Sequence, residues 1–212
     1  AEQVGEWVEK AFAKYPDQIP VLTEYAGWKV SQEEFDDANL ALAKIEQLAG
    51  NMPRAMLLKG KIAFAQQSYE LAESRFAELH KLEPESAEIG NLWAMSLAES
   101  SSADKLALAL ETAQQNLQRQ PQNAYAAVIL GWVYFQQKNY EQANLWFSRA
   151  AQTPNLPPEA GYYFARFLQH IGKKEDAIKL LETALTSTNL FLYRNSAIAL
   201  KGELGAGGGS LV

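Results

Sequence analysis

Cysteine is absent from the sequence, so disulfide bonds and thiolate chemistry are excluded. Histidine is scarce: His80 and His170 lie far apart, and neither has a second ligand at a metal-binding spacing. No serine lies in a G-x-S-x-G nucleophile motif. The stretch GELGAGGGS lacks the lysine, the preceding strand and the following helix of a phosphate-binding loop. We therefore predict no catalytic residue, no metal site and no cofactor, and hence a protein that is not an enzyme.

Long hydrophobic runs and clusters of positive charge are also missing. No apolar run reaches the roughly 18 residues that a membrane span requires, and no charged start precedes an apolar stretch as it does in a signal peptide. We therefore expect neither a signal peptide nor a transmembrane segment in this chain, which leaves a cytoplasmic and a periplasmic location both open. The formal net charge is −6 and no run of Lys or Arg occurs. Nucleic acid is not an expected partner, because phosphate binding needs a concentrated basic surface.

An internal repeat is the main feature that the sequence does contain. Four segments are alike, FDDANLALAKI, YELAESRFAEL, YEQANLWFSRA and KEDAIKLLETA. Each has an alanine at the same relative position, and a step of 34 residues separates the first two and the last two alanines, which are Ala38, Ala72, Ala143 and Ala177. The middle step of 71 residues divides into 37 and 34 when Ala109 is inserted. Apolar or small residues follow each alanine at four and seven positions, which places them on one helix face.

A second helical stretch precedes each of these segments, and no stretch alternates as a strand does. The sequence therefore predicts an all-α array of antiparallel helix pairs. Residues 124–157 resemble the tetratricopeptide repeat (TPR) most closely, through Leu130, Gly131, Tyr134, Ala143, Phe147 and Ala150. The resemblance covers nearly the whole chain, which is similar to long bacterial arrays of the family. It implies a right-handed superhelical solenoid of helix pairs.

The 34-residue spacing also sets the expected boundaries. We expect a single solenoid over residues 1–204, followed by a flexible glycine-rich tail over 205–212. Within the solenoid we expect a half unit at 1–18, units at 19–52, 53–86, 87–123, 124–157 and 158–191, and a closing helix at 192–204. The chain opens on the second helix of a pair, so Trp7, Val8 and Phe12 would leave apolar area open. We expect either a fragment of a longer array or an end that pairs with another molecule.

The resemblance implies where a partner would bind, since the first helices of successive units line a concave groove in this family. The groove residues implied are Arg54, Leu57, Lys61, Phe64, Asn91, Met95, Tyr125, Val128, Trp132, Phe135, Tyr162, Arg166 and Gln169. Large apolar side chains predominate among them, which is typical of interaction surfaces. They lack the full basic and asparagine set that clamps the carboxylate of a chaperone. Trp132 has a second interpretation, as a side chain that fills the gap between adjacent units.

The expected function is that of a non-enzymatic protein-interaction scaffold. Its groove would bind a peptide or helix of a protein partner that the sequence does not identify. The alternative is a structural or assembly subunit whose groove or open ends mediate self-association, giving a homo-oligomer.

Overall fold

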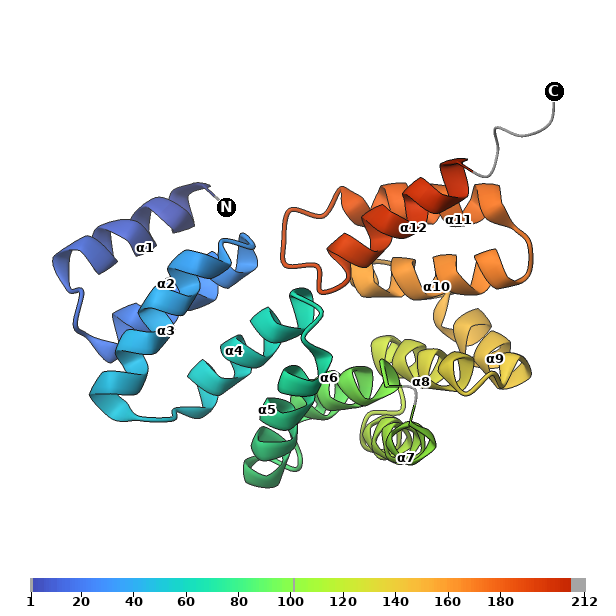
Figure 1. Cartoon of the computed structure of the whole chain (residues 1–212), viewed down its shortest axis with the longest axis horizontal. Helices are drawn as coiled ribbons and strands as arrows, with labels where there is room; N and C mark the ends of the chain where they lie inside the picture. The colour runs from blue at the N-terminus through green and yellow to red at the C-terminus, as the bar shows by residue number, and fades with distance from the viewer. Residues whose placement is uncertain (1, 101, 207–212) are drawn as a thin grey trace. The chain divides into compact units, whose positions relative to one another are not determined.

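The computed structural model describes residues 2–100 and 102–206, which form twelve α-helices and no strand (Figure 1). The all-α helical repeat fold that the sequence predicts is confirmed. The described residues form two compact units. The first contains the residues up to Glu83 together with Thr188–Leu190, and the second contains Pro84–Ser187 together with the residues from Phe191 onward.

The first unit contains five helices. They are α1 (Glu2–Lys14), α2 (Ile19–Ser31), α3 (Phe35–Ala49), α4 (Pro53–Ala65) and α5 (Tyr69–Leu82). Helix α2 pairs with α3, and α4 pairs with α5. Proline stands in the first turn of α2 and of α4, where its fixed φ suits a helix and its missing N–H is not needed.

The second unit contains seven helices. They are α6 (Ala87–Ala98), α7 (Ala103–Arg119), α8 (Ala124–Gln136), α9 (Tyr140–Ala150), α10 (Pro158–His170), α11 (Lys174–Leu185) and α12 (Arg194–Ala206). Helices α6 and α7, α8 and α9, and α10 and α11 form pairs, and α12 packs against α11. The side chains of Asn123 and Asn139 cap α8 and α9 by accepting hydrogen bonds from Ala126 N (3.1 Å) and Gln142 N (3.2 Å).

The helix starts can be compared with the expected boundaries. Residues 19, 53, 87, 124 and 158, where units were expected to begin, are each the first residue of a helix. The last helix runs from Arg194 to Ala206 rather than over 192–204, because Leu192 and Tyr193 form a turn whose side chains are buried. Of the expected tail, residues 205 and 206 are helical, and 207–212 lie outside the described residues. The division into these units stays a prediction.

In four of the helix pairs, the same type of turn joins the first helix to the second. Its central residue has a positive φ, at Glu33 (63°), Gln67 (61°), Lys138 (61°) and Gly172 (81°). The next residue donates its N–H to a carbonyl five positions back, as in Ser68 to Ala63 (2.8 Å). This arrangement satisfies carbonyls that the end of the first helix leaves unpaired.

Close approach of the paired helices depends on small residues. A Cβ added to Gly60 would lie 2.5 Å from the Phe76 ring, and one added to Gly131 would lie 2.7 Å from the Phe147 ring. The four repeat alanines of the sequence pattern are completely buried. Small residues on one helix thus receive large ones from its partner, which explains the alternation in the repeat.

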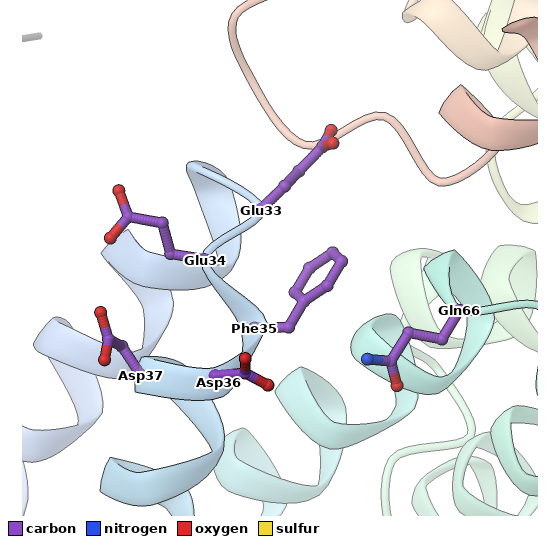
Figure 2. Close-up of a pocket in the computed structure, with 6 residues that line it drawn as sticks. All are labelled: Glu33, Glu34, Phe35, Asp36, Asp37 and Gln66. Carbon is purple, nitrogen blue, oxygen red and sulfur yellow. The ribbon is translucent and has the colours of Figure 1, made fainter.

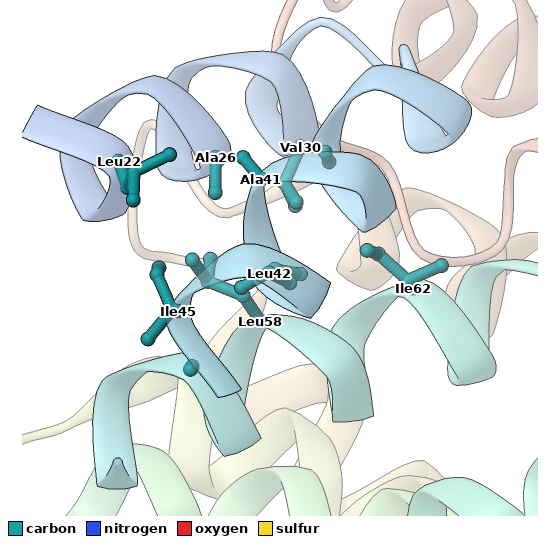
Figure 3. Close-up of a cluster of buried hydrophobic side chains, with 10 residues drawn as sticks. Leu22, Ala26, Val30, Ala41, Leu42, Ile45, Leu58 and Ile62 are labelled. Atoms are coloured by element: carbon teal, nitrogen blue, oxygen red, sulfur yellow. The ribbon is translucent and has the colours of Figure 1, made fainter. Parts of the chain in front are cut away.

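A cluster of buried aliphatic residues in the first unit forms a core between α2, α3 and α4 (Figure 3). Phe12 of α1 packs against this core and stacks on Tyr25 at 4.0 Å between ring centroids. Leu190 packs against the same core, which is why Thr188–Leu190 belongs to the first unit. The buried members are Leu22, Ala26, Val30, Ala38, Ala41, Leu42, Ile45, Ala55, Leu58 and Ile62.

Candidate functional site

Four of the predicted groove residues lie on α4 in the first unit. Arg54 is exposed and forms an ion pair with Glu24 (2.9 Å). Leu57 and Lys61 are half-buried, whereas Phe64 is completely buried. These four side chains therefore do not form one continuous apolar surface.

The predicted residues of α6 are buried in the second unit. Asn91 accepts a hydrogen bond from Asn116 Nδ2 of α7 (3.0 Å), so it joins the two helices of its own pair. Met95 is completely buried, and its sulfur accepts a hydrogen bond from the hydroxyl of half-buried Tyr125 (3.4 Å). Val128 of α8 is also completely buried.

The predicted aromatic residues of α8 and α10 are brought together. Trp132 is 1% exposed and Tyr162 is 5% exposed, and their ring centroids lie 5.9 Å apart. Trp132 stacks on half-buried Phe135 (5.4 Å) and on Tyr163 (4.5 Å). Arg166 and Gln169 follow on α10 and are half-buried.

The chain's own connection between α11 and α12 buries these aromatic rings. Tyr193 stacks on Tyr162 at 4.6 Å and meets Tyr163 edge-on at 5.1 Å. The Tyr193 ring also makes an edge contact with Trp132 at 6.4 Å, and its side chain is 1% exposed. We call these five residues, Trp132, Phe135, Tyr162, Tyr163 and Tyr193, the aromatic cluster.

Two carboxylates hold the connecting segment in place. Glu99 Oε1, just after α6, accepts hydrogen bonds from the Tyr193 hydroxyl (2.6 Å) and from Trp132 Nε1 (3.0 Å). Glu159 of α10 is 6% exposed, and its Oε1 accepts a hydrogen bond from the backbone N–H of Leu192 (3.0 Å). The segment is therefore bound by a phenol and by a backbone amide as well as by ring stacking.

Burial controls the ionisation of these groups. It raises the pKa of Glu99 above the usual 4.5, while hydrogen bonds from Tyr193 and Trp132 and the charge of Arg166 offset part of the rise. Burial also raises the pKa of Tyr193 well above 10, and the negative charge of Glu99 adds to this effect. The phenol therefore stays protonated and acts as the donor.

The sequence alone did not indicate Glu99, Tyr163, Phe191, Leu192 or Tyr193 as site residues. Glu99 stands in the polar stretch ESSSADK, which has the composition of a surface turn. The available signal was the run of three large apolar residues, Phe-Leu-Tyr, directly before the last helix. All three are buried, with Phe191 1% exposed.

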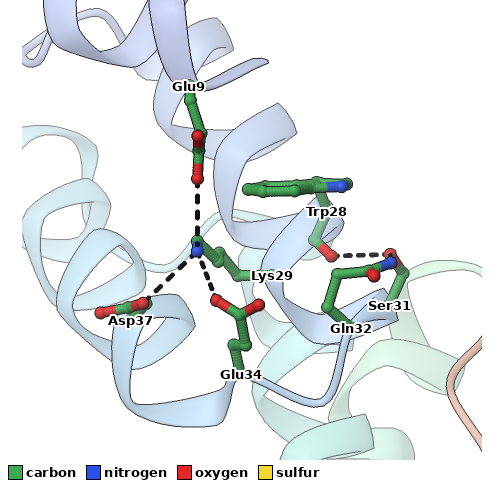
Figure 4. Close-up of polar contacts among 7 residues, drawn as sticks. All are labelled: Glu9, Trp28, Lys29, Ser31, Gln32, Glu34 and Asp37. Atoms are coloured by element: carbon green, nitrogen blue, oxygen red, sulfur yellow. Dashed lines mark hydrogen bonds and ion pairs between the residues drawn. The ribbon is translucent and has the colours of Figure 1, made fainter. Parts of the chain in front are cut away.

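The first unit contains an acidic pocket at the start of α3, with a volume of about 510 Å³ (Figure 2). Its lining residues are Glu33, Glu34, Phe35, Asp36, Asp37 and Gln66. Glu34 and Asp37 point away from Gln66 in Figure 2 and bind Lys29 in Figure 4. In the described residues, no group of three or more His, Asp or Glu side chains is placed to hold a metal ion.

Lys29 is the buried cation beside this pocket. Its side chain is 8% exposed and forms ion pairs with Glu9 (3.7 Å), Glu34 and Asp37 (3.5 Å), as Figure 4 shows. Its ammonium group also lies 4.6 Å from the centre of the Trp28 ring. Burial lowers the pKa of Lys29, but the hydrogen bond with Glu34 and the surrounding negative charge outweigh this and raise it overall.

An apolar pocket of about 440 Å³ lies in the second unit, among residues of α9, α10 and α11. Its apolar lining residues include Phe147, Phe164, Phe167, Leu168 and Leu180. Within the described ranges, no helix is both long enough and apolar enough to cross a membrane.

Comparison with known proteins defines the class. Residues 102–184 match the family model described as anaphase-promoting complex, cyclosome, subunit 3. No curated protein sequence matches the chain. A tetratricopeptide repeat protein from Parabacteroides merdae is 12% identical, with a TM-score of 0.71 over 96% of this chain and 78% of its own.

Two further solved structures have similar folds. A chain of the APC/C hetero-tetramer Cut9–Hcn1 is 17% identical, with a TM-score of 0.65 over 94% of this chain and 38% of its own. YrrB is 16% identical, with a TM-score of 0.56 over 86% of this chain and 92% of its own.

Successive helix pairs, their common turn and the small-to-large contacts within each pair define a helical repeat protein. Within that class, the chain has the tetratricopeptide repeat fold, and the resemblance found in the sequence is confirmed.

Proposed function

We propose that this chain is a non-enzymatic protein-interaction scaffold whose second unit binds a peptide segment of a partner protein. The segment would bind to residues of α8 and α10, in exchange with the chain's own Phe191–Tyr193. Repeat proteins of this architecture generally use surfaces built from successive repeats to bind other proteins.

The observation that carries this proposal is that these helices already bind an irregular segment. Trp132 and Tyr162, both expected to contact a partner, contact the ring of Tyr193 instead. Arg166 Nε is buried and makes no hydrogen bond to any described residue, so a carbonyl or carboxylate of a partner could accept one from it. YrrB is described as having an unusual peptide-binding site, which favours the same use of the fold here.

The test removes the side chains of the chain's own segment by mutation and adds the same segment as a separate peptide. A peptide covering residues 186–194 is titrated calorimetrically into the Phe191→Ala/Tyr193→Ala chain. We expect saturable binding that protects amides of α8 and α10 from hydrogen exchange. If the variant does not fold alone, binding is read as peptide-dependent recovery of the helical circular dichroism signal.

Two controls define the outcome. A scrambled peptide should not bind, and the Ile198→Ala chain should not bind the native peptide, since Ile198 is 54% exposed on α12 and its replacement leaves the site filled. Failure of the native peptide to bind or refold the vacated chain would contradict the proposed function.

An exposed apolar face on α1 favours a second candidate function, an assembly subunit that self-associates. Val4 is 60% exposed and Trp7 is 75% exposed, whereas Phe12 on the same helix packs against the core. Sedimentation over a range of concentrations should reveal an oligomer that Trp7→Ser weakens and Leu145→Ser, an exposed change on α9, does not. A strict monomer at every concentration would contradict this candidate.

A further inference from the structure

The Tyr193 site has features that ring packing alone does not require. Tyr162 covers one face of the Tyr193 ring, while Tyr163 and Trp132 contact it edge-on. Any aromatic side chain could satisfy these contacts. The hydroxyl is different, since it donates to Glu99 Oε1 (2.6 Å) and accepts from the Tyr163 hydroxyl (3.1 Å).

Phenylalanine in this position would leave two polar groups short of partners. Glu99 would keep only the hydrogen bond from Trp132, and the Tyr163 hydroxyl would lose its acceptor. A buried polar group without its partner costs free energy, and the cost is larger when the group is charged. The site therefore distinguishes a phenol from a benzene ring.

The backbone contact adds a second requirement. Glu159 accepts the N–H of Leu192, the residue directly before the tyrosine, so that position needs a free backbone N–H and excludes proline. Leu192 is 7% exposed and Phe191 is 1% exposed, so both positions before the tyrosine are apolar and buried. Both carboxylates come from the array, and each accepts a hydrogen bond from the same short segment.

We propose that the second unit selects a partner segment that presents a tyrosine after two apolar residues. This inference rests on the proposed function. The phenol of the partner would lie between Tyr162, Tyr163 and Trp132 with its hydroxyl on Glu99, and the preceding backbone N–H would bind Glu159. Phe191–Tyr193 is then an internal competitor with the chemistry of the ligand, and a partner binds only as this segment leaves.

The experiment compares two hexapeptides on the Phe191→Ala/Tyr193→Ala chain. One is Asn-Leu-Phe-Leu-Tyr-Arg, the sequence of residues 189–194, and the other has phenylalanine in place of tyrosine. Loss of the hydrogen bond to the half-buried carboxyl group of Glu99 predicts binding about tenfold weaker for the phenylalanine peptide. Adding Glu99→Leu, which removes the acceptor, should lower the ratio of the two affinities to what the hydrogen bond from Tyr163 alone contributes.

A second variant keeps the test decisive if the leucine variant does not fold. Glu99→Gln retains a neutral acceptor, so the preference for tyrosine should fall between the two values. Equal binding of the two peptides to the chain with Glu99 intact would overturn tyrosine selection and leave the proposed function standing. Binding of neither peptide would overturn the proposed function as well. A wild-type dimer that the tyrosine peptide dissociates would identify the occupant as a second copy and overturn selection of a foreign partner.

Discussion

In the first unit the buried charged side chain is the cation Lys29, whereas in the second unit the charged groups of the site are the carboxylates of half-buried Glu99 and buried Glu159. Lys29 is surrounded by carboxylates from α1 and from the turn and start of α3, each about half exposed. Glu99 and Glu159 instead accept hydrogen bonds from the segment between α11 and α12. The charge network around Lys29 is therefore supplied by helices and a turn within the repeat, whereas that of the second unit depends on the segment that connects α11 and α12.

Removal of the Tyr193 ring should have the largest effect. Tyr193→Ala should lower the free energy of unfolding of the second unit by about 3–5 kcal/mol, because it opens a cavity among stacked rings and removes a donor from Glu99. Urea unfolding followed by circular dichroism measures the loss. Ile198→Ala, an exposed change on α12, should stay within about 0.5 kcal/mol. Equal stability of Tyr193→Ala and wild type would show that the segment is not bound as described.

Matched glycine substitutions test the packing that both units share. Gly60→Ala and Gly131→Ala should each destabilise by about 1–3 kcal/mol, because the added Cβ meets a buried phenylalanine ring. Gly27→Ala and Gly202→Ala also fall inside helices, but their Cβ atoms meet nothing within 4 Å. These two should stabilise by about 0.5–1 kcal/mol. Thermal unfolding of the four variants checks the contrast, and the same sign for all four would contradict it.

Lys29→Met tests the charge network of the first unit. We expect a loss of about 1–2 kcal/mol, less than for a fully buried pair because the three carboxylates can be hydrated again. The raised pKa of Lys29 means that its contribution is complete below pH 10.5 and is lost as pH rises through the folded-state value. Denaturant unfolding of the wild type and of the Lys29→Met variant across pH 7–12 measures this loss of stability. Lys10→Met, in an exposed pair with Glu6, should change stability little.

Glu99→Gln should give the smallest net change in the free energy of unfolding, and this change should depend on pH. The folded chain holds the Glu99 proton more tightly than the unfolded chain, so stability falls as pH rises from 4.5 through the raised folded-state value. The amide oxygen of glutamine can still accept both hydrogen bonds. The stability of the Glu99→Gln variant should therefore increase relative to that of the wild type as pH rises through this window. Denaturant unfolding at pH 4 to 8 checks this, and a difference independent of pH would contradict it.

Much of the fold could be predicted because it depends on local and regularly spaced residues. Ala38, Ala72, Ala143 and Ala177 repeat along the sequence, and each is completely buried in the structure. The last helix was less predictable, since Leu192 and Tyr193 are apolar residues that fit a helix pattern equally well. Their burial in the second unit, a tertiary effect, decides their conformation.

The candidate site was only partly predictable for a related reason. Trp132 and Tyr162 lie on α8 and α10, the first helices of two successive helix pairs, so the repeat predicts that their helices are neighbours. Glu99 and Tyr193 are 94 residues apart and follow no repeat. Only the path of the connection between α11 and α12 brings them together, and a single sequence contains no periodic signal for that path.

The most direct test of an exchangeable segment is native-state hydrogen exchange of the Leu192 amide, which is bonded to Glu159. The measurement follows its exchange rate at increasing urea below the unfolding transition and compares it with amides in the middle of α8 and α10. If the segment can leave while the helices stay folded, the Leu192 amide should exchange through a local opening of lower free energy that depends little on urea. Exchange of the Leu192 amide only with global unfolding of the second unit would contradict the account, because the segment would then be a permanent part of the core.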